Sequence, residues 1–262
     1  MNISNPFYTC KNCWLYLGDC VEVMKEIPSN KFDMIFADPP YFLSNGSFTC
    51  QNGIAVSVVK GKWDIGGSQL DNYRFHLSWI SECYRVLKPG GTIWISGTYH
   101  SIYQCAMALA EFDFKVLNDI IWFKPNASPN LSCRFFTASH ESLIWARKGQ
   151  KTKHIFNYDL MKNGDWGSDF IKKPNTQMRS VWAINPPKKE EKQFGKHPTQ
   201  KPLELLQRII MSCTNEGSLI LDPFTGSSTT GVAAKKLGRK FVGIDIMQEY
   251  LDLSINRLEH VI

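Results

Sequence analysis

The stretch that decides the fold is LILDPFTGSSTTG, residues 219–231. A short apolar run is followed by a turn at Gly226, where a glycine permits a sharp bend and close approach to the backbone. Ser227 or Ser228 can then cap a helix. A second apolar run, 241–244, follows that helix. The order of strand, turn, helix and strand predicts one unit of an α/β sheet.

Strands and helices alternate along most of the remaining chain. Apolar runs predict seven strands, at 14–17, 32–37, 92–96, 116–123, 142–146, 219–221 and 241–244. Apolar spacing predicts helices at 21–27, 72–87, 101–112, 203–212, 228–237 and 248–258. We therefore expect a doubly wound, Rossmann-like α/β sheet. Two stretches break the pattern, because 42–67 predicts a long binding loop and 148–195 is polar, basic and irregular.

The charge of the chain is unevenly distributed. Its 262 residues carry a net charge of +6, and 43% of them are hydrophobic, enough for one large domain with an insertion. Residues 147–201 alone contain 13 Lys or Arg and five Asp or Glu. This excess predicts a polyanionic partner such as nucleic acid, although a solvated basic loop would give the same count. We divide the chain into two halves of one catalytic domain, 1–146 and 197–262, and an insertion at 147–196.

Cysteine usage predicts a reducing compartment, which we take to be the cytoplasm. Most of the eight cysteines lie singly inside apolar runs. Cys10 and Cys13 form the one close pair, and a structural zinc site would normally need a second pair, so no metal is expected. Neither a signal-peptide pattern nor an apolar run of about 18 residues is present, so no membrane segment is expected.

Two aspartates at the ends of predicted strands indicate a nucleoside cofactor. Asp222 closes the first strand of the opening unit, and Asp245 closes the second. An acid at the second position is placed to accept both ribose hydroxyls, but the glycine spacing of a pyrophosphate cradle is missing. S-adenosylmethionine has a ribose and no pyrophosphate, and therefore fits. Ordinary turn or cap roles remain the alternative for each carboxylate. The predicted cofactor residues of this unit are Asp222, Pro223, Phe224, Gly226, Ser227 and Asp245.

Two further segments extend the predicted cofactor site. HPTQKP, residues 197–202, precedes a helix, and we expect Thr199 and Lys201 to bind a carboxylate there, with His197 beside them. Asp19 ends the first strand, where it could accept a hydrogen bond from an adenine amine. A basic helix cap and an ordinary N-cap are the alternative roles of these two segments.

The tetrapeptide Asp38-Pro39-Pro40-Tyr41 follows a buried strand and predicts the catalytic group. Asp38 and the carbonyl of Pro39 would accept hydrogen bonds from an amine on a flat ring. Tyr41 would stack on that ring, and the rigid prolines would aim the carbonyl. The alternative is a simple turn, since Asp and Pro are common turn residues.

Together these segments resemble the β class of DNA amino-methyltransferases, in which the catalytic tetrapeptide precedes the cofactor segment. The matching stretches are 17–19, 38–41, 88–91, 121–126, 139–141, 197–202, 222–227 and 243–245. The aspartate at 38 resembles the N6-adenine members, and 38–45 is most similar to the second adenine methyltransferase of DpnII-type systems. Asp245 departs from many relatives, which carry Glu there.

The resemblance implies a seven-stranded S-adenosylmethionine-dependent sheet with one antiparallel strand and a target-recognition region. It also implies GATC as the site, activity on single strands, and direct methyl transfer to a flipped adenine without a metal. Phosphate contacts are expected from Lys172, Lys173, Arg179, Lys188 and Lys189. Base-edge contacts are expected from Trp166, Asn175, Gln177 and Arg179.

Three alternatives remain open at this point. A protein-glutamine methyltransferase could use a similar tetrapeptide, typically with Asn first. An N4-cytosine DNA methyltransferase would use nearly the same chemistry and usually carries Ser at the first position. A catalytically silent DNA-binding subunit would retain the fold without turnover. The recognition sequence, the presence of a partner endonuclease, and whether the protein forms a homodimer are not determined by the sequence.

Overall fold

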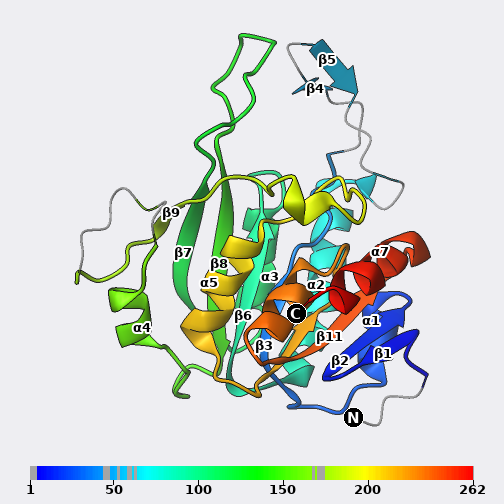
Figure 1. Ribbon diagram of the computed structural model, residues 1–262, viewed down its shortest axis with the longest axis vertical. Coiled ribbons are helices and arrows are strands. Elements are labelled where there is room, and N and C mark those ends of the chain that lie inside the picture. The colour runs from blue at the N-terminus through cyan, green and yellow to red at the C-terminus, as the bar shows by residue number, and fades with distance from the viewer. Residues whose placement is uncertain are drawn as a thin grey trace.

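The computed structural model describes residues 5–43, 48–51, 54–57, 61, 64–166, 169 and 175–261. A single large sheet forms the centre of the molecule (Figure 1). Its strands, in spatial order, are β1 (Tyr8–Cys10), β2 (Cys13–Leu17), β11 (Lys240–Asp245), β10 (Leu219–Asp222), β3 (Phe32–Ala37), β6 (Leu87–Gly97), β8 (His140–Lys148), β7 (Phe114–Phe123) and β9 (Val181–Ala183).

All seven predicted strands are present in this sheet, and β8 runs antiparallel to both of its neighbours. The sheet is nevertheless larger than predicted, because it has nine strands within the described residues. The two extra strands, β1 and β9, are three-residue strands at the two edges. Such short strands carry too few residues to show an apolar alternation, so the sequence pattern could not reveal them.

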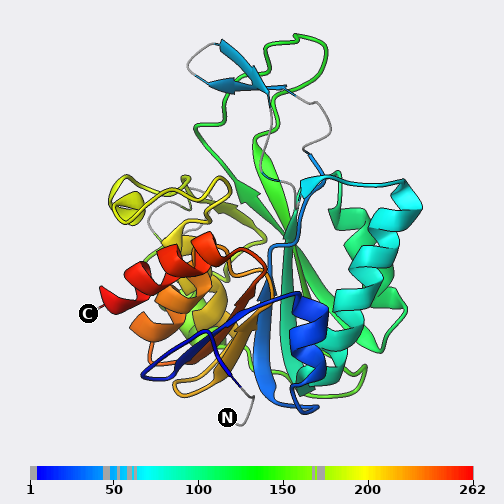
Figure 2. The same cartoon turned by 90° about the vertical axis from the view of Figure 1, so that its right-hand side faces the viewer.

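Helices cover both faces of the sheet, as a doubly wound fold requires (Figure 2). One face carries α1 (Cys20–Lys25), α2 (Gln69–Val86) and α3 (Ile102–Ala110). The other carries α5 (Leu203–Cys213), α6 (Thr229–Lys236) and α7 (Gln248–Glu259). Helix α2 begins three residues earlier than predicted because Ser68 and Asp71 form a capping box. In the described part of the chain, no helix combines the length and apolarity needed to cross a membrane.

The predicted loop 42–67 contains regular structure, so its description as a plain loop was wrong. It includes a two-stranded antiparallel sheet, β4 (Phe48–Gln51) and β5 (Ile54–Ser57). Its two ends are joined by the buried Asp64, whose carboxylate accepts the amide protons of Phe42 and Leu43 at 2.8 and 3.1 Å. This segment and the loop 124–139 project together from one end of the molecule (Figures 1 and 2).

The basic stretch 147–196 is joined to the core by a buried ion pair. It contains α4 (Tyr158–Asn163), the edge strand β9 and a short 3-10 helix at Glu190–Lys192. The Asp169 carboxylate accepts a hydrogen bond from the Arg208 guanidinium at 2.7 Å and from the Ala183 amide at 3.0 Å. The guanidinium also lies 4.9 and 5.2 Å from the rings of Trp166 and Trp182. The stretch thus follows the β9 edge of the sheet and ends beside α7, where the ring centroids of Phe194 and His260 lie 4.4 Å apart.

We predict that Asp169→Asn lowers the free energy of unfolding by about 3–5 kcal/mol, because it leaves the Arg208 charge buried without its main partner. Urea unfolding measures this change. Glu204→Gln is the matched control, since the Glu204 carboxylate is half exposed and lies 3.5 Å from the same guanidinium. It should cost at most about 1 kcal/mol. Equal losses in the two variants would contradict the structural role of Asp169.

Candidate active site

The site lies where the winding of the sheet reverses. From β10 the chain crosses through α6 to β11 on one side, and from β3 it crosses through α2 to β6 on the other. Ligands of open α/β sheets bind outside the carboxyl ends of the strands at such a switch point. Asp38 follows the end of β3, and Asp222 and Asp245 are the last residues of β10 and β11. The topology therefore brings these three acids to one edge.

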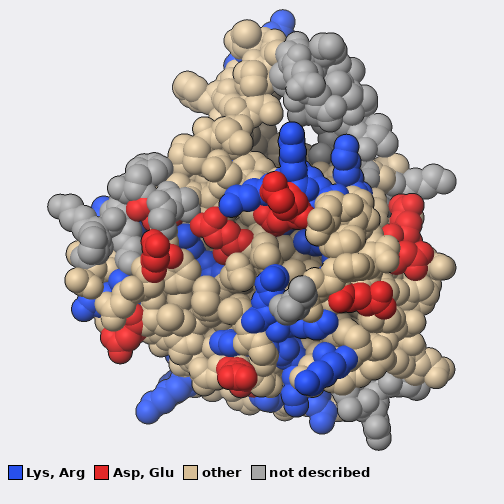
Figure 3. Space-filling view, in the orientation of Figure 1, with Lys and Arg blue, Asp and Glu red and all other residues tan. Residues whose placement is uncertain are grey.

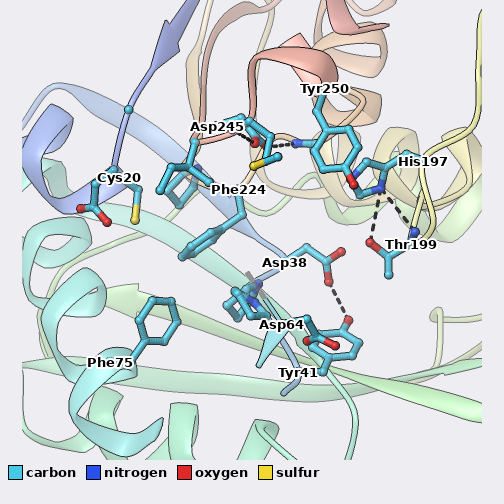
Figure 4. A pocket seen from close by; sticks show the side chains of 18 of the residues that line it. Cys20, Asp38, Tyr41, Asp64, Phe75, His197, Thr199, Phe224, Asp245 and Tyr250 are labelled. Atoms are coloured by element: carbon cyan, nitrogen blue, oxygen red, sulfur yellow. Dashed lines mark hydrogen bonds between the residues drawn. The ribbon is translucent and has the colours of Figure 1, made fainter. Parts of the chain in front are cut away.

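A cavity of about 250 Å³ opens at this edge. It is slightly smaller than most small-molecule sites, which span about 300–1,000 Å³. Figure 4 shows its labelled side chains pointing toward a common space. Eleven predicted site residues line it: Asp19, Asp38, Pro39, Pro40, Tyr41, His197, Thr199, Pro223, Phe224, Gly226 and Asp245. Lys201, Asp222 and Ser227 instead line a smaller adjoining cavity that shares Asp38 and His197 with the first.

One wall of the cavity is aromatic. The ring centroids of Phe75 and Phe224 lie 6.2 Å apart, and Trp79 packs edge-on against Phe224 at 5.3 Å. Phe42 packs against Phe75 at 5.6 Å, which connects this wall to the segment after the tetrapeptide. Flat apolar surfaces of this kind suit the faces of a heteroaromatic ring.

The carboxylates at the strand ends also stabilise their own turns. Asp245 accepts the amide protons of Gly226 and Met247 at 2.8 and 2.9 Å. Burial raises the pKa of Asp245, and these backbone bonds partly offset the rise. Asp19 caps α1 by accepting the amides of Val21 and Glu22 through its Oδ1. Asp19 and Asp245 therefore have local structural roles in addition to the ligand roles predicted for them.

The absence of a side chain at Gly226 leaves space for the His197 ring. Gly226 has φ +50°, and a Cβ at this position would lie 3.1 Å from the His197 imidazole. The imidazole packs edge-on against Tyr250 at 4.2 Å, and its Nδ1 accepts the amide proton of Thr199 at 3.3 Å (Figure 4). A side chain at 226 would crowd the imidazole and would also strain the backbone, because L side chains rarely adopt this positive φ.

The Asp38 carboxylate is held from two directions. Its Oδ1 accepts a hydrogen bond from the Tyr41 hydroxyl at 2.6 Å, and its Oδ2 accepts one from the Lys201 ammonium at 2.5 Å. The Tyr41 hydroxyl also lies 2.9 Å from the Ser96 hydroxyl and 3.1 Å from the Glu141 carboxylate. Glu141 is 3.5 Å from Lys201.

Electrostatics within this cluster set the charge of each group. Burial raises the pKa of Asp38 above its ordinary 3.8; Lys201 opposes the rise and Glu141 adds to it. Burial alone would raise the pKa of Glu141, but Lys201 and Lys124 outweigh it and lower that pKa to about 2. Burial alone would lower the pKa of Lys201, but its two carboxylates raise it. Burial also raises the pKa of Tyr41, so its phenol stays protonated.

The structure gives Lys201 contacts that the sequence did not predict. The sequence predicts that Lys201 binds a cofactor carboxylate, but the structure places its ammonium between Asp38 and Glu141. The side chain is only 6% exposed, so both carboxylates take up its charge inside the protein. This geometry favours a role in holding Asp38.

Several residues of the site were not singled out from the sequence. Lys124 and Glu141 lie in stretches that carried the resemblance, but no role was assigned to them. Since β8 is antiparallel, Glu141 near its start reaches the edge where β3 and β6 end. That strand direction is the signal that could have found it. The other missed residues are Gly18, Cys20, Leu43, Asp64, Phe75, Ser96, Ile246, Met247 and Tyr250.

The residues predicted to contact DNA differ in their exposure to solvent. Arg179, Lys188 and Lys189 are exposed, and the two lysines immediately precede the 3-10 helix. Asn175 and Gln177 are exposed as well. Trp166 instead packs on Arg208 and donates its indole proton to the carbonyl of Met161, so it is occupied in the fold. Lys172 and Lys173 lie outside the described residues. Figure 3 shows Lys and Arg gathered beneath the projecting loop, mixed with acidic residues.

Comparison with known proteins gives the class. A family model described as DNA methylase matches residues 32–256. The chain belongs to this DNA methylase family, which confirms the resemblance inferred from the sequence. It is 49% identical to the type II methyltransferase M2.DpnII of Streptococcus pneumoniae over 258 residues, 98% of this chain and 93% of that protein. It is 49% identical to M2.MboI of Moraxella bovis over 253 residues, 96% of this chain and 89% of that protein.

Solved structures agree on the fold. A crystal structure of the M1.HpyAVI–SAM complex has a TM-score of 0.69 and 29% identity, covering 94% of this chain and 98% of that chain. The cytosine-N4-specific PvuII DNA methyltransferase has a TM-score of 0.75, covering 98% of this chain and 90% of that chain. At 21% identity, the second comparison supports the fold alone.

We predict that Glu141→Gln moves the acid limb of the pH profile of kcat/KM for DNA methylation to lower pH. The physical reason is that the Glu141 charge raises the pKa of Asp38, and its removal leaves Lys201 to stabilise the ionised carboxylate. Activity is lost as pH falls through the Asp38 pKa, so a lower pKa preserves activity further into acid. The control is Asp33→Asn, which removes a carboxylate of β3 that pairs with Lys88 of β6. An unmoved limb in Glu141→Gln would contradict the coupling.

Proposed function

We propose that this protein transfers a methyl group from S-adenosylmethionine to the N6 amine of adenine in a short DNA site, and that the site is GATC. The observation that carries the proposal is the Asp38-Pro39 rim of the cavity, with its carboxylate fixed by Tyr41 and Lys201. The similarity to M2.DpnII and M2.MboI supports the choice of DNA as substrate.

The cavity fits the cofactor. Phe75 and Phe224 offer an aromatic wall to its adenine, and Asp245 and Asp19 offer carboxylate oxygens to the ribose and the amine. The amino-acid part of the cofactor would bind beside Thr199 and the turn at Gly226. When bound, S-adenosylmethionine supplies a methyl group on a sulfonium, which is already an excellent leaving group.

The protein then mainly has to hold the amine. Each oxygen of Asp38 already accepts one hydrogen bond, and a carboxylate oxygen can accept another. Asp38 and the Pro39 carbonyl would accept the two N6 protons and localise the nitrogen lone pair. Because burial raises the pKa of Asp38, the carboxylate can also receive the proton that methylation releases. Positioning and preorganised electrostatics supply the rate.

The target adenine must leave the duplex to reach Asp38, at a cost of a few kcal/mol. The Tyr41 ring lies at the cavity with its hydroxyl fixed by Asp38, and stacking on it would contribute about 1–3 kcal/mol.

We retain Arg179, Lys188 and Lys189 as phosphate contacts, and Asn175 and Gln177 as base-reading residues, because all five are exposed. Activity on single strands, a homodimer and a cytoplasmic location remain part of the proposal.

The experiment that tests the reaction uses isotopically labelled S-adenosylmethionine with GATC-containing DNA, followed by nucleoside mass spectrometry. N6-methyladenine is the expected product, and it should disappear when GATC is absent. N4-methylcytosine would favour the alternative base. No product on single- or double-stranded DNA would contradict the proposed function.

We predict that Asp38→Ala lowers the methylation rate by at least about a hundredfold to a thousandfold, the scale on which one preorganised electrostatic contact acts. Cofactor affinity, measured by calorimetry, should change little. Asp38→Asn keeps the shape of the side chain and serves as the variant most certain to fold. Near-normal turnover by both variants would show that Asp38 does not hold the amine.

We predict that Lys188→Ala with Lys189→Ala weakens DNA binding uniformly across sequences and reduces the slope of log affinity against log salt by about 0.9 per lost phosphate contact. Fluorescence anisotropy over a salt series measures both effects. Lys25→Ala is the control, because Lys25 lies on α1 and pairs with Glu22 of the same helix. A slope unchanged from that of the control would remove the two lysines from the interface.

A further inference from the structure

The loop 124–139, between β7 and β8, presents two neighbouring aromatic rings to solvent. Phe136 is 99% exposed and Phe135 is 68% exposed. Aromatic side chains dominate cores and interfaces when they are buried, so an adjacent pair this exposed marks a contact surface. We call Phe135, Phe136 and the residues around them, 130–137, the arm tip.

The arm tip is an organised turn. The Asn130 side chain donates to the carbonyl of Phe135 at 2.8 Å, and its amide oxygen accepts the backbone proton of Ser132 at 3.0 Å. The backbone N–H of Asn130 donates to the Thr137 hydroxyl at 3.4 Å. These bonds tie the two sides of the turn together, so the rings are presented from a preformed loop.

A third aromatic residue, Tyr99, lies beside the arm tip and connects it with the active site. Tyr99 is 60% exposed and packs on His100 with ring centroids 3.9 Å apart. A cavity of about 200 Å³ is lined by Thr98, Tyr99, Phe135, Phe136, Thr137, Ala138, His140 and Ser142. Ser96 and Glu141, which contact the Tyr41 hydroxyl, lie within a few residues of Tyr99 and His140.

Charge indicates what the arm tip binds. Between Lys124 and His140 the chain has two basic residues, Lys124 and Arg134, and no acidic residue. The loop projects from the sheet edge that carries Asp38 (Figures 1 and 2). Exposed aromatic rings in a basic setting are the pattern of proteins that stack on the bases of nucleic acids.

We propose that the arm tip stacks on DNA bases next to the flipped adenine, with Phe135 and Phe136 supplying the stacking faces. This inference rests on the proposed function, because it takes DNA as the substrate. Removing a base from the duplex leaves its neighbours without a stacking partner on one side, and an aromatic ring stacked on a neighbouring base can replace that partner. The rings thereby stabilise the open DNA that presents adenine to Asp38.

The test compares Phe135→Ala/Phe136→Ala with the wild-type protein on a GATC duplex. We expect kcat/KM for DNA to fall about ten- to a hundredfold, since stacking of a base on an aromatic ring is worth one to two powers of ten in affinity. The affinity for S-adenosylmethionine should stay unchanged. The matched control is Tyr103→Ala/Met107→Ala, which removes two similarly exposed apolar side chains from α3 and should retain full activity.

A second pair of variants separates stacking from simple apolar contact. Phe135→Tyr/Phe136→Tyr should keep activity because the ring faces remain, whereas Phe135→Leu/Phe136→Leu should lose most of it. Equal activity of the Leu and Tyr variants, or an Ala variant as active as the control, would overturn the proposal. So would sedimentation data showing that the Ala variant merely loses self-association. A wild-type protein that methylates no DNA would instead refute the proposed function.

Discussion

The ion pair between Lys201 and Asp38 is the interaction on which the rest of the site depends. The two side chains are 6% and 14% exposed, and their charged atoms are 2.5 Å apart. A carboxylate with so little water is stable in its ionised form only beside a cation or several hydrogen-bond donors. Lys201 supplies the cation, and Tyr41 supplies a donor whose own position is set by Ser96 and Glu141.

The sheet makes this cluster by bringing remote parts of the chain to one edge. Asp38 and Tyr41 follow β3, Ser96 is near the end of β6, Glu141 is near the start of β8, and Lys124 follows β7. The four strands are consecutive neighbours in the sheet. The antiparallel direction of β8 is essential here, because in a parallel strand a residue near its start would lie at the opposite edge.

Much of the fold followed from the sequence because long apolar runs and helical spacing are strong local signals. The seven core strands and the six main helices were predicted on that basis. The edge strands β1 and β9 were missed because three residues carry no periodic pattern, and β4 and β5 were missed because their segment reads as Ser-, Asn- and Gly-rich loop. Pairing across the chain, which defines such strands, is not a local property.

The candidate site likewise contains residues that local sequence signals predict and residues that only the folded chain brings together. The turn at Gly226 and the acids at strand ends could be predicted, because each is marked by its place beside an apolar run. The partner of Asp38 could not, since Lys201 is 163 positions away and only the folded sheet brings the two together. For that reason Lys201 was predicted as a cofactor ligand, whereas the structure favours a role in positioning Asp38. The exposed Phe135 and Phe136 carried no signal in a loop between two strands.

A double-mutant cycle on Asp38→Asn and Lys201→Met, read out as single-turnover methyl transfer, tests this central claim most directly. If Lys201 acts by holding Asp38, its loss should slow the wild-type background about a hundredfold and barely slow the Asp38→Asn background, because residues that act as one unit are strongly non-additive. Equal slowing in both backgrounds, accompanied by equal losses of cofactor affinity, would contradict the account and restore Lys201 as a cofactor ligand.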